Sequence, residues 1–532
     1  MKTVLILGAG IMQIPGIRIA KGKGWRVIVA DGNPEAQGRD LGDYFVHVDL
    51  KDRDGLLAVA REWKERVGLD GVFTAGTDFS ASVAWVCESL GLPGIPFAAA
   101  MRATDKCLMR AAFDAAGVPS PRYACWTGNG DPLGSLSVLP FPLVVKPVDN
   151  MGARGVRRVD EPEELREACR SAIALSRTSR VIIEQYMDGR ELSLDAVVHR
   201  GAVTVCGVAD RHIFFPPRFV EMGHTMPTDL DPRTVDRIES VFAAGIRALG
   251  IDNGAAKGDV MLTSQGPMVG EIAARLSGGY MSGWTFPLSS GVEVTEAALN
   301  IAVGLPPGDL SPRVRRVCAE RAVISIPGVV QSVDGEEAAR AVAGTAEVFL
   351  RTGPGKEVVF PANNVEKCGN VISVADTRGE AILAARSAIS ALSIRLQPLV
   401  DATTRYLFRE TGNDAFDLSD TNPAGMAAGM PPFRGDPRGM LPGSPVFLEI
   451  PEAFTRVTAE DWHGTSLGAA IRQVRERTGA LVSGDPPHAN FVLSGLFWRA
   501  LLRGSAQGGI YLVESVRLAA ERGTLRELLA SL

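Results

Sequence analysis

Short apolar runs alternate with helix-like spacing of apolar residues along the first 100 residues of the chain. The runs are rich in Val, Ile, Leu and Phe, and the segments between them repeat apolar positions every three or four residues. The predicted strands are 4–7, 27–30, 46–48 and 71–74, and the predicted helices are 15–23, 55–65 and 80–89. Such alternation is typical of βαβ units, so this region predicts an α/β domain with a parallel sheet.

The pattern changes in the middle of the chain. Residues 138–195 follow the order strand, glycine loop, strand, helix, strand, turn and strand, which predicts a small α+β module. Residues 200–300 add a strand, a loop rich in aromatic residues and prolines, a helix, and a hairpin with Ser264-Gln265-Gly266 at its turn. Residues 315–400 form another strand-rich unit that is closed by a helix.

A predicted break in regular structure precedes the last part of the chain. Residues 421–443 contain five glycines and five prolines in 23 residues, which is too many for a regular element and predicts a flexible or extended linker. Residues 444–532 are mainly helical by pattern and contain no constellation of reactive side chains. Trp462 and Trp498 are predicted to belong to a small packed core there.

The composition fits a globular protein of three or four domains. The chain has 532 residues, 46% hydrophobic and 22% charged, and its net charge of −5 combines interspersed charges of both signs. This balance gives no footprint for nucleic acid or an anionic membrane, so an anionic ligand needs a local basic site. The start MKTVLILGAG runs directly into a strand, and no apolar run is long enough to span a membrane. We therefore expect a cytoplasmic protein.

The seven cysteines are predicted to be reduced and mostly buried. They are scattered, odd in number, and form neither a CxxC pair nor a cluster with histidine at metal-ligand spacing. Their positions are 87, 107, 125, 169, 206, 318 and 368.

The turn Gly8-Ala9-Gly10 raises a nicotinamide hypothesis. It follows a strand, precedes a helix, and has Asp31 about 20 residues further on, as in dinucleotide-binding folds. The third glycine of that fingerprint is replaced by Gln13, whose bulk would spoil the close contact of helix and sheet. The favoured interpretation is a related fold that uses this turn differently, with NAD(P) binding and a purely architectural turn as alternatives.

The stretch VVKPVDNMGARGV (144–156) places Lys146 at the end of an apolar strand, ahead of a glycine loop. A lysine among buried neighbours needs an anionic partner, and a phosphate would serve. The loop offers backbone N–H groups at glycines that tolerate unusual φ/ψ angles, and Arg154 adds a cation. These features predict a flap that closes over phosphates, with an ordinary hairpin as the alternative.

Downstream carboxylates favour the phosphate hypothesis. The segment IIEQYMDGRE (182–191) can hold an adenine by its main chain, and Glu191 can bind ribose hydroxyls. Asp259 and Glu271 lie roughly opposite each other on the predicted hairpin, each with apolar neighbours. Two such carboxylates are hard to bury unless they share a cation, so we expect Mg²⁺ with phosphate oxygens. Solvent-facing hairpin acids are the alternative.

Taken in order, these motifs resemble the ATP-grasp superfamily of carboxylate–amine ligases over roughly residues 1–400. The matching features are an N-terminal α/β domain, Asp105-Lys106, VVKP with its glycine loop, EQYMDGRE, and an aspartate followed by EIAARLSGG. The resemblance implies an α/β and α+β multidomain chain with a nucleotide clamped between two α+β subdomains. The implied domains are a Rossmann-like preATP-grasp domain at 1–100, an ATP-grasp domain at 101–310 with its lid at about 138–195, an associated α+β domain at 311–400, a linker at 401–443, and an extra, mainly helical domain at 444–532.

The resemblance also implies a role for each matching residue. The residues implied at the ATP phosphates are Lys106, Lys146 and Lys257, with Gly152, Ala153, Arg154 and Gly155 over the transferred phosphate. Those implied at adenine and ribose are Glu184, Gln185, Tyr186, Met187 and Glu191. Asp259 and Glu271 are implied as metal ligands, and Arg275 as the partner of the acyl-phosphate oxygens.

One position departs from the family pattern. Many members have asparagine two residues after the second metal-binding glutamate, whereas this chain has Ala273. That leaves one Mg²⁺ a ligand short, so either a water replaces the ligand or the second metal binds more weakly.

The segment DRHIFFPPRFVEMGHTMP (210–227) resembles the substrate loop of L-amino acid ligases. Glu221, His224 and Arg275 would then face the amino and carboxylate groups of the substrates, with a structural histidine as the alternative for His224. Residues 315–400 resemble the C-terminal domain shared by these ligases and phosphoribosylamine–glycine ligase.

The implied reaction has two steps. A small-molecule carboxylate attacks the γ-phosphate of ATP, with Mg²⁺ or Mn²⁺ as the metal, to give an acyl phosphate and ADP, and an amine then displaces phosphate. Amino acids or similar metabolites are the expected substrates, and the resemblance alone implies a homodimer. A ligase acting on a thiol or another nucleophile, and a non-catalytic ATP-binding protein, share the same motifs and stay open as alternatives.

Overall fold

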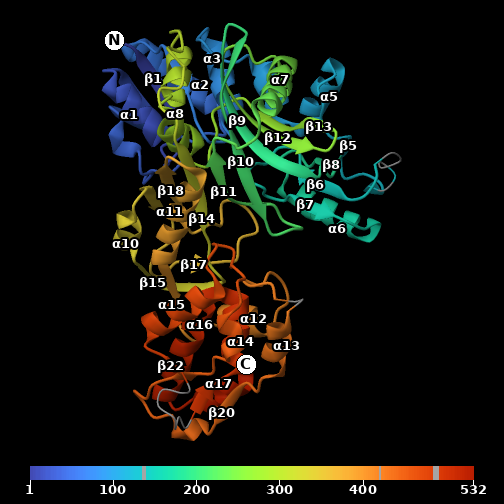
Figure 1. The fold of residues 1–532 in the computed structure, drawn as a ribbon. Coiled ribbons are helices and arrows are strands. Elements are labelled where there is room, and N and C mark those ends of the chain that lie inside the picture. The colour runs from blue at the N-terminus through green and yellow to red at the C-terminus, as the bar shows by residue number, and fades with distance from the viewer. Residues whose placement is uncertain (133, 135–138, 419–420, 483–490) are drawn as a thin grey trace. The chain divides into compact units, whose positions relative to one another are not determined.

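The structure of the protein is a computed structural model that describes residues 1–132, 134, 139–418, 421–482 and 491–532. The chain divides into two units (Figure 1). Unit 1 comprises Met1–Glu320 and Val374–Ala381, and unit 2 comprises Arg321–Ser373 and Ile382–Leu532. Residue 138, where the predicted lid begins, and residues 483–490 of the predicted domain 444–532 lie outside the described residues.

The first 100 residues form the predicted parallel sheet, in the strand order β3-β2-β1-β4. Its elements are β1 (Thr3–Leu7), α1 (Ile14–Gly22), β2 (Arg26–Asp31), η1 (Arg39–Leu41), β3 (Tyr44–His47), α2 (Arg53–Val67), β4 (Gly71–Phe73) and α3 (Ser80–Leu90). Strand β1 is buried at every position, as a central parallel strand covered on both faces should be. The carboxyl ends of these strands place Asp31 and the Thr77-Asp78 loop at one edge of the sheet.

A four-stranded antiparallel sheet with the order β5-β8-β6-β7 forms the smaller part of the predicted ATP-grasp domain. The elements of this region are α4 (Phe97–Thr104), α5 (Lys106–Ala116), β5 (Tyr123–Trp126), β6 (Leu143–Pro147), β7 (Arg157–Val159), α6 (Pro162–Leu175) and β8 (Val181–Gln185). Helix α6 buries Leu165 and Ala172 in one cluster with Leu143 and Val145 of β6. This packing leaves the other face of β6, which carries Lys146, free to contribute to a site.

A third sheet contains the long strands of the domain and includes, in unit 1, the order β13-β12-β9-β10-β11 (Figure 1). The elements are β9 (Gly189–His199), β10 (Ala202–Phe214), β11 (Val220–Met226), α7 (Pro232–Leu249), β12 (Gly254–Thr263), β13 (Gly266–Ala273), η3 (Met281–Thr285), α8 (Phe286–Ser290) and α9 (Val294–Ala302). Helix α7 packs Phe242 against β12 at Gly258, where a Cβ atom would lie 2.3 Å from the phenyl ring. The glycine therefore permits the close approach of helix and sheet.

Unit 2 is built from short strands and helices. Its first elements are β15 (Gly328–Asp334), α10 (Glu336–Ala341), β16 (Thr345–Leu350), β17 (Glu357–Val358) and β19 (Ser393–Leu396), while β14 (Val317–Val323), β18 (Gly369–Ala375) and α11 (Arg378–Ala391) have residues in both units. The later elements are α12 (Asp401–Phe408), α13 (Asn422–Gly429), β20 (Phe433–Gly435), η4 (Pro437–Gly439), β21 (Phe447–Leu448), α14 (Glu452–Thr455), α15 (Leu467–Thr478), β22 (Leu481–Val482), β23 (Phe491–Leu493), α16 (Gly495–Glu521) and α17 (Leu525–Ser531).

The segment 401–443 differs from the expected linker, because it carries α12, α13 and β20. Tyr406 and Phe408 of α12 are buried in the core of unit 2, and β20 pairs antiparallel with β23. Its many glycines and prolines exclude long elements, but they do not exclude short ones that pack through a few apolar side chains.

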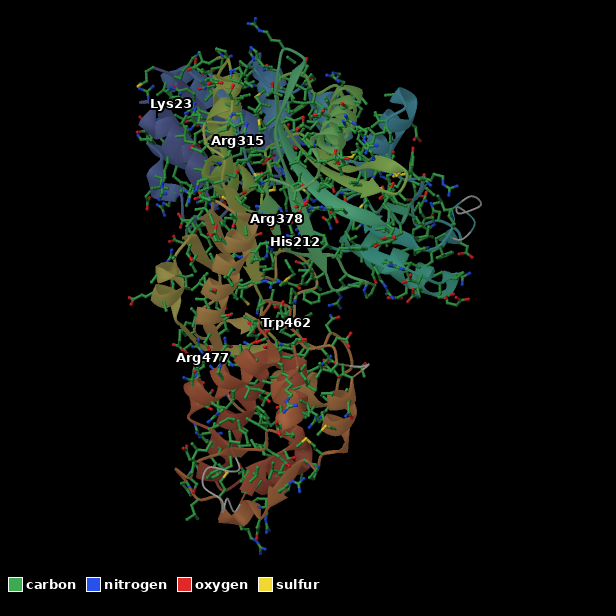
Figure 2. The ribbon with its side chains drawn as sticks, viewed as in Figure 1. Lys23, His212, Arg315, Arg378, Trp462 and Arg477 are labelled. Carbon is green, nitrogen blue, oxygen red and sulfur yellow. A yellow bond between two sulfur atoms is a disulfide. The ribbon has the colours of Figure 1, made fainter. Side chains whose placement is uncertain are left out.

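The two tryptophans of the last region lie where the sequence places them. Trp498 is fully buried and stacks on Phe454 with ring centroids 3.8 Å apart. Trp462, labelled in Figure 2, packs edge-on against Phe360 at 5.2 Å. The predicted packed core is therefore confirmed, and the described residues of this region are mainly helical, with the short strands β21, β22 and β23 beside α14, α15, α16 and α17. In the part of the chain that the structure describes, no helix is both long enough and apolar enough to cross a membrane.

Two leucines of unit 2 test this core. Leu501 on α16 is 0% exposed and Leu441 is 65% exposed. Leu501→Ala should lower the free energy of unfolding by about 2–5 kcal/mol, because it removes buried methyl groups and leaves a cavity. The matched change Leu441→Ala should alter it by less than about 0.5 kcal/mol. Guanidinium unfolding of both variants measures the difference, and equal effects would contradict the packing described here.

Candidate active site

Lys146 is held by a buried carboxylate on the neighbouring strand. Its Nζ lies 2.6 Å from Oε2 of Glu184 on β8, and Nε of Arg110 on α5 donates to Oε1 of Glu184 at 2.8 Å. Burial raises the pKa of Glu184, but the charges of Arg110 and Lys146 outweigh it and lower that pKa. Glu184, predicted at adenine, is thus an ionised group that fixes the position of Lys146.

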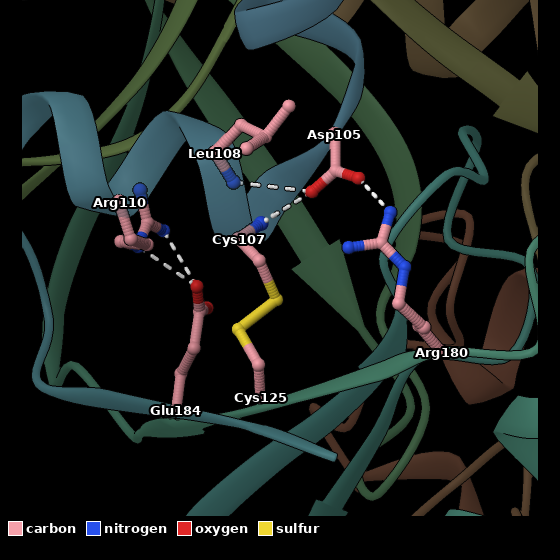
Figure 3. Close-up of a disulfide and its surroundings, with 7 residues drawn as sticks. All are labelled: Asp105, Cys107, Leu108, Arg110, Cys125, Arg180 and Glu184. Atoms are coloured by element: carbon pink, nitrogen blue, oxygen red, sulfur yellow. Dashed lines mark hydrogen bonds and ion pairs between the residues drawn. A yellow bond between two sulfur atoms is a disulfide. The ribbon is translucent and has the colours of Figure 1, made fainter. Parts of the chain in front are cut away.

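Lys106 follows a helix cap and points toward the same region. Asp105 accepts hydrogen bonds from the backbone N–H groups of Cys107 and Leu108, which begins α5, and Arg180 binds its other oxygen (Figure 3). Nζ of Lys106 donates to the carbonyl of Asn150 at 2.8 Å and lies 3.4 Å from Oε1 of Glu271. The structure therefore brings Lys106 to the start of the glycine loop and to a predicted metal ligand.

A disulfide joins Cys107 of α5 to Cys125 of β5 beside these residues (Figure 3). The prediction that all cysteines are reduced is wrong for this pair and holds for Cys87, Cys169, Cys206, Cys318 and Cys368, which are free. The two Cα atoms are 6.3 Å apart, within reach of a disulfide. A separation of 18 residues carries no sequence signature, because only the folding of β5 beside α5 brings the two thiols together.

The predicted hairpin is confirmed, with its two acids directly opposite each other. Asp259 on β12 pairs in register with Glu271 on β13, and Lys257 pairs with Ala273. Lys257 binds Oδ2 of Asp259 from the same strand face, as the two-residue spacing predicts. Two opposed carboxylates supply the oxygen ligands that Mg²⁺ or Mn²⁺ prefers, so these residues fit a divalent cation.

Glu271 has an unusual electrostatic environment. Burial raises its pKa, but the charges of Lys106, Lys146, Lys257 and Arg275 outweigh that effect and lower the pKa to about 2. Four cationic side chains from four different segments therefore surround one carboxylate.

The glycine loop adopts the backbone that its sequence predicts. Gly152, Ala153 and Gly155 have φ angles of 67°, 61° and 75°, in the left-handed region. Nε of Arg154 donates to the carbonyl of Met151, and its Nη2 lies 3.0 Å from Oδ2 of Asp78. Arg154 thus ties the loop to the end of the N-terminal sheet, and its contact with a transferred phosphate stays a prediction.

Arg275 is fixed from two sides. Its Nε donates to the carbonyl of Thr77 at 3.0 Å, and its Nη1 donates to the carbonyl of Leu276 at 3.0 Å. Asp195 on β9 accepts hydrogen bonds from both the backbone N–H and the hydroxyl of Ser277, which holds the segment that carries Arg275. Asp195 is fully buried, and burial raises its pKa to about 6.

The predicted substrate residues converge on a buried partner. One ligand-type atom of each of Glu221, His224 and Glu320 lies within 4.8 Å of the others. Nδ1 of His224 is 3.2 Å from Oε2 of Glu320, and its Nε2 is 2.9 Å from Oγ1 of Thr285. His224 and Glu320 are almost completely buried, so the histidine lies inside the protein on strand β11 rather than on an exposed loop.

Part of the segment that is predicted to bind adenine and ribose already makes contacts within the protein. The N–H groups of Gln185 and Tyr186 donate to the carbonyls of Arg122 and Pro142. If adenine binds here as predicted, the main-chain groups left for it are those of Met187 and the carbonyls of this segment. Glu191, predicted at ribose, binds Nη1 of Arg211 at 2.5 Å.

The glycine turn of the N-terminal sheet has its own internal partners. Oε1 of Gln13 accepts from Gly10 N–H at 3.0 Å, and Oδ2 of Asp31 accepts from Ala9 N–H at 2.7 Å. A Cβ atom at Gly8 would lie 2.9 Å from the Gln13 side chain. The N–H groups that a dinucleotide would need are therefore already used, which argues against the nicotinamide hypothesis.

Sequence reasoning missed four charged residues of this region. Arg110, Asp195, Arg211 and Glu320 each bind a predicted site residue or the segment that carries one. Only Arg110 has a local signal, since it lies one helical turn after Lys106 on α5. Asp195 and Glu320 have partners that are far away in the sequence, and Arg211 combines its hairpin partner Glu221 with Glu191 and Asp259 on other strands.

Three family models match successive parts of the chain. Residues 17–94 match an ATP-grasp N-terminal domain, residues 139–283 an ATP-grasp domain, and residues 322–397 the L-amino acid ligase C-terminal domain 2. The chain therefore contains the domains of an ATP-grasp protein, which confirms the resemblance and the predicted fold class. Within that class, the third match points to the L-amino acid ligases.

The chain is also similar to individual proteins. The chain is 28% identical over 363 residues to the uncharacterized protein y4rH of Sinorhizobium fredii, covering 66% of this chain and 74% of that one. It is 27% identical over 345 residues to carnosine synthase 1 of Mus musculus, covering 59% of this chain but only 41% of that relative. The crystal structure of L-amino acid ligase from Bacillus licheniformis has a TM-score of 0.66 at 24% identity, over 75% of this chain and 99% of that one, which shows a shared fold.

The disulfide determines how many free thiols the unfolded protein has before and after reduction. Unfolded without reductant, the protein should expose five thiols, the free cysteines, and reduction should raise the count to seven. Cys107→Ser should give the same count with and without reductant, and should lower the free energy of unfolding by about 3 kcal/mol, the entropic effect of a loop of this size. Thiol titration of the unfolded protein measures the first result, and seven thiols without reductant would contradict the pairing.

The raised pKa of Asp195 predicts a pH-dependent stability. Between the ordinary pKa of 3.8 and about 6, the folded protein keeps a proton that the unfolded chain releases. The free energy of unfolding contributed by Asp195 therefore falls as pH rises through this window, by about 3 kcal/mol. Asp195→Asn should remove this slope, so the variant gains stability relative to the natural protein from pH 4 to 6 and levels off above.

Urea unfolding at several pH values measures this difference. Ser277→Ala provides a second test, because loss of a hydrogen bond that lowers the Asp195 pKa should extend the window to higher pH. A stability difference between Asp195→Asn and the natural protein that does not change with pH would contradict the assignment.

Proposed function

We propose that the protein is an ATP-dependent ligase that activates a carboxylate as an acyl phosphate, releases ADP, and joins the acyl group to an amine. The observation that carries this proposal is the set of four cations around Glu271. Lys106, Lys146, Lys257 and Arg275 bring positive charges from separate segments to one carboxylate, and the oxygens of a triphosphate bound with a divalent cation would give these side chains further partners. The named relatives, a carnosine synthase and an L-amino acid ligase, support an amino acid or a similarly small molecule as substrate.

Asp259 and Glu271 would hold Mg²⁺, or Mn²⁺ in its place. Bound there with ATP, the metal would neutralise phosphate oxygens and align the γ-phosphate with its attacker. Ala273 stands opposite Lys257 where many family members have a metal-binding asparagine. The ammonium group of Lys257 therefore supplies positive charge beside the position that lacks a ligand, which supports a weaker second metal.

The first step depends on positioning rather than on a base. The substrate carboxylate is already ionised near neutral pH, so it can attack the γ-phosphate directly. Lys146, oriented by Glu184, and Arg275, oriented by Thr77, would stabilise the charge on the transferred phosphate. Arg154 and the glycine loop would cover it and keep water from the acyl phosphate.

The second step requires an amine that has lost its proton. Glu221 would bind the amino group, and His224, whose two ring nitrogens contact Glu320 and Thr285, would support that side of the site from inside. Glu320 beside Nδ1 of His224 fixes the orientation of the imidazole ring. The position of Glu221 beside this histidine supports a substrate role for Glu221, with Arg275 at the carboxylate.

Two alternatives remain within the same ATP chemistry. A ligase that passes the acyl group to a thiol would use the same phosphate residues and differ in its product. A non-catalytic protein would bind ATP without turnover. A homodimer and a cytoplasmic location complete the proposal, and both rest on the family resemblance and on the sequence pattern.

The first experiment measures phosphate, ADP and AMP separately, from Mg-ATP incubated with amino acids singly and in pairs. We expect phosphate and ADP only with particular pairs. Lys146→Gln should reduce the rate by about 100-fold or more, since it removes a charge that stabilises the transition state but keeps a hydrogen-bond donor for Glu184. Arg170→Gln, at a side chain 71% exposed on the lid helix α6, is the matched control and should retain full activity.

Each other outcome identifies a different function. AMP and pyrophosphate would contradict an acyl phosphate, and full activity of Lys146→Gln would contradict the site. Turnover that requires a thiol would establish the first alternative. Tight ATP binding without turnover across the panel would establish the second.

A further inference from the structure

Arg211 is the internal cation that connects three acids of the site. It lies on β10, and its side chain is 11% exposed. Its Nη1 is 2.5 Å from Oε1 of Glu191 and 2.9 Å from Oδ1 of Asp259, and its Nη2 is 2.5 Å from Oε2 of Glu221. A single guanidinium group thus contacts the acids predicted at ribose, metal and substrate.

The sheet order explains how one side chain reaches all three. Strand β10 lies between β9, which carries Glu191, and β11, which carries Glu221, and β12 with Asp259 follows beyond β9. The planar fork of arginine directs several N–H donors outward in one plane, so it can serve acceptors on both sides. A lysine has one charged nitrogen and cannot replace this geometry.

Both carboxylate oxygens of Asp259 are paired with cations. Oδ1 faces Arg211 at 2.9 Å, and Oδ2 binds Lys257. A divalent cation that binds Asp259 therefore meets two positive charges that already contact this carboxylate. When nucleotide is bound, Lys257 can contact a phosphate instead of Asp259. Arg211 can stay in place, because Glu191 and Glu221 are also its partners.

We propose that Arg211 is a positioning residue that acts as an internal counter-ion, so that Asp259 binds a divalent cation well only when nucleotide is also present. The inference rests on the proposed function, because it takes Asp259 as a metal ligand. In the absence of nucleotide, Arg211 and Lys257 neutralise the acid and compete with free metal. Nucleotide phosphates attract Lys257 away, and the metal then enters without leaving Glu191 and Glu221 unpaired.

The test is the binding of Mn²⁺ alone, without nucleotide, measured by electron paramagnetic resonance on the full chain. Arg211→Met should bind Mn²⁺ at least about tenfold more tightly than the natural protein, because it removes a competing positive charge next to Asp259. Arg211→Lys should give a smaller gain, since it keeps the charge but cannot contact all three acids. Arg233→Met removes an exposed arginine at the start of α7 and should leave Mn²⁺ binding unchanged.

With ATP present, the difference in Mn²⁺ affinity between Arg211→Met and the natural protein should shrink to less than about threefold, because nucleotide then supplies the stronger interaction. Unchanged Mn²⁺ affinity in folded Arg211→Met or Arg211→Lys would overturn the inference, and so would an equal gain in Arg233→Met. Circular dichroism establishes that each variant is folded, and Arg211→Lys provides the answer if Arg211→Met is not. Because Mn²⁺ binding is measured without turnover, failure of the proposed ligase activity would show separately, as absence of ADP from the natural protein.

Discussion

Charge balance inside unit 1 is the constraint on which the site depends. Moving a carboxylate or an ammonium group out of water costs several kcal/mol unless partners compensate it. Glu184 has Arg110 and Lys146, and Glu271 has four surrounding cations. Glu184, Asp259 and Glu271 are therefore each placed where a segment distant in sequence supplies a counter-charge. The fold is the means by which these charges meet.

The register of the paired strands decides which charged side chains lie next to each other. Because side chains alternate between the faces of a strand, a slip of one residue between β12 and β13 would turn Asp259 and Glu271 to opposite faces. The same sheet places Asp195 of β9 next to Lys257 of β12, and Asp195 also holds Ser277. Sheet pairing thus fixes the acids directly and Arg275 indirectly.

Local patterns were sufficient for much of the fold and for part of the site. The parallel sheet of the first 100 residues, the hairpin with Asp259 opposite Glu271, and the left-handed glycine loop follow from periodicity and turn chemistry, and all are present. The segment 401–443 was harder, because a few buried side chains outweigh a composition rich in glycine and proline.

The contacts of the site that the sequence did not predict share one physical reason. The Cys107–Cys125 disulfide, the Arg211–Asp259 pair and the His224–Glu320 pair join segments that no local spacing relates. The positions of Lys106 and Lys146 follow from family motifs, yet their buried partners depend on which strands become neighbours. Sequence motifs identify the groups that meet a ligand more readily than the groups that hold them in place.

The ion pair between the glycine loop and Asp78 affects how long the loop stays in its observed position. Asp78 pairs with Arg154 at 3.0 Å and with Arg177 at 3.1 Å, and both arginine side chains are about 40% exposed. Ion pairs this accessible to water are weakened by dissolved ions, which screen charges over about 10 Å at 0.1 M salt. Salt concentration should therefore alter how long the loop stays in this position between binding events, while the buried pairs beneath it change far less.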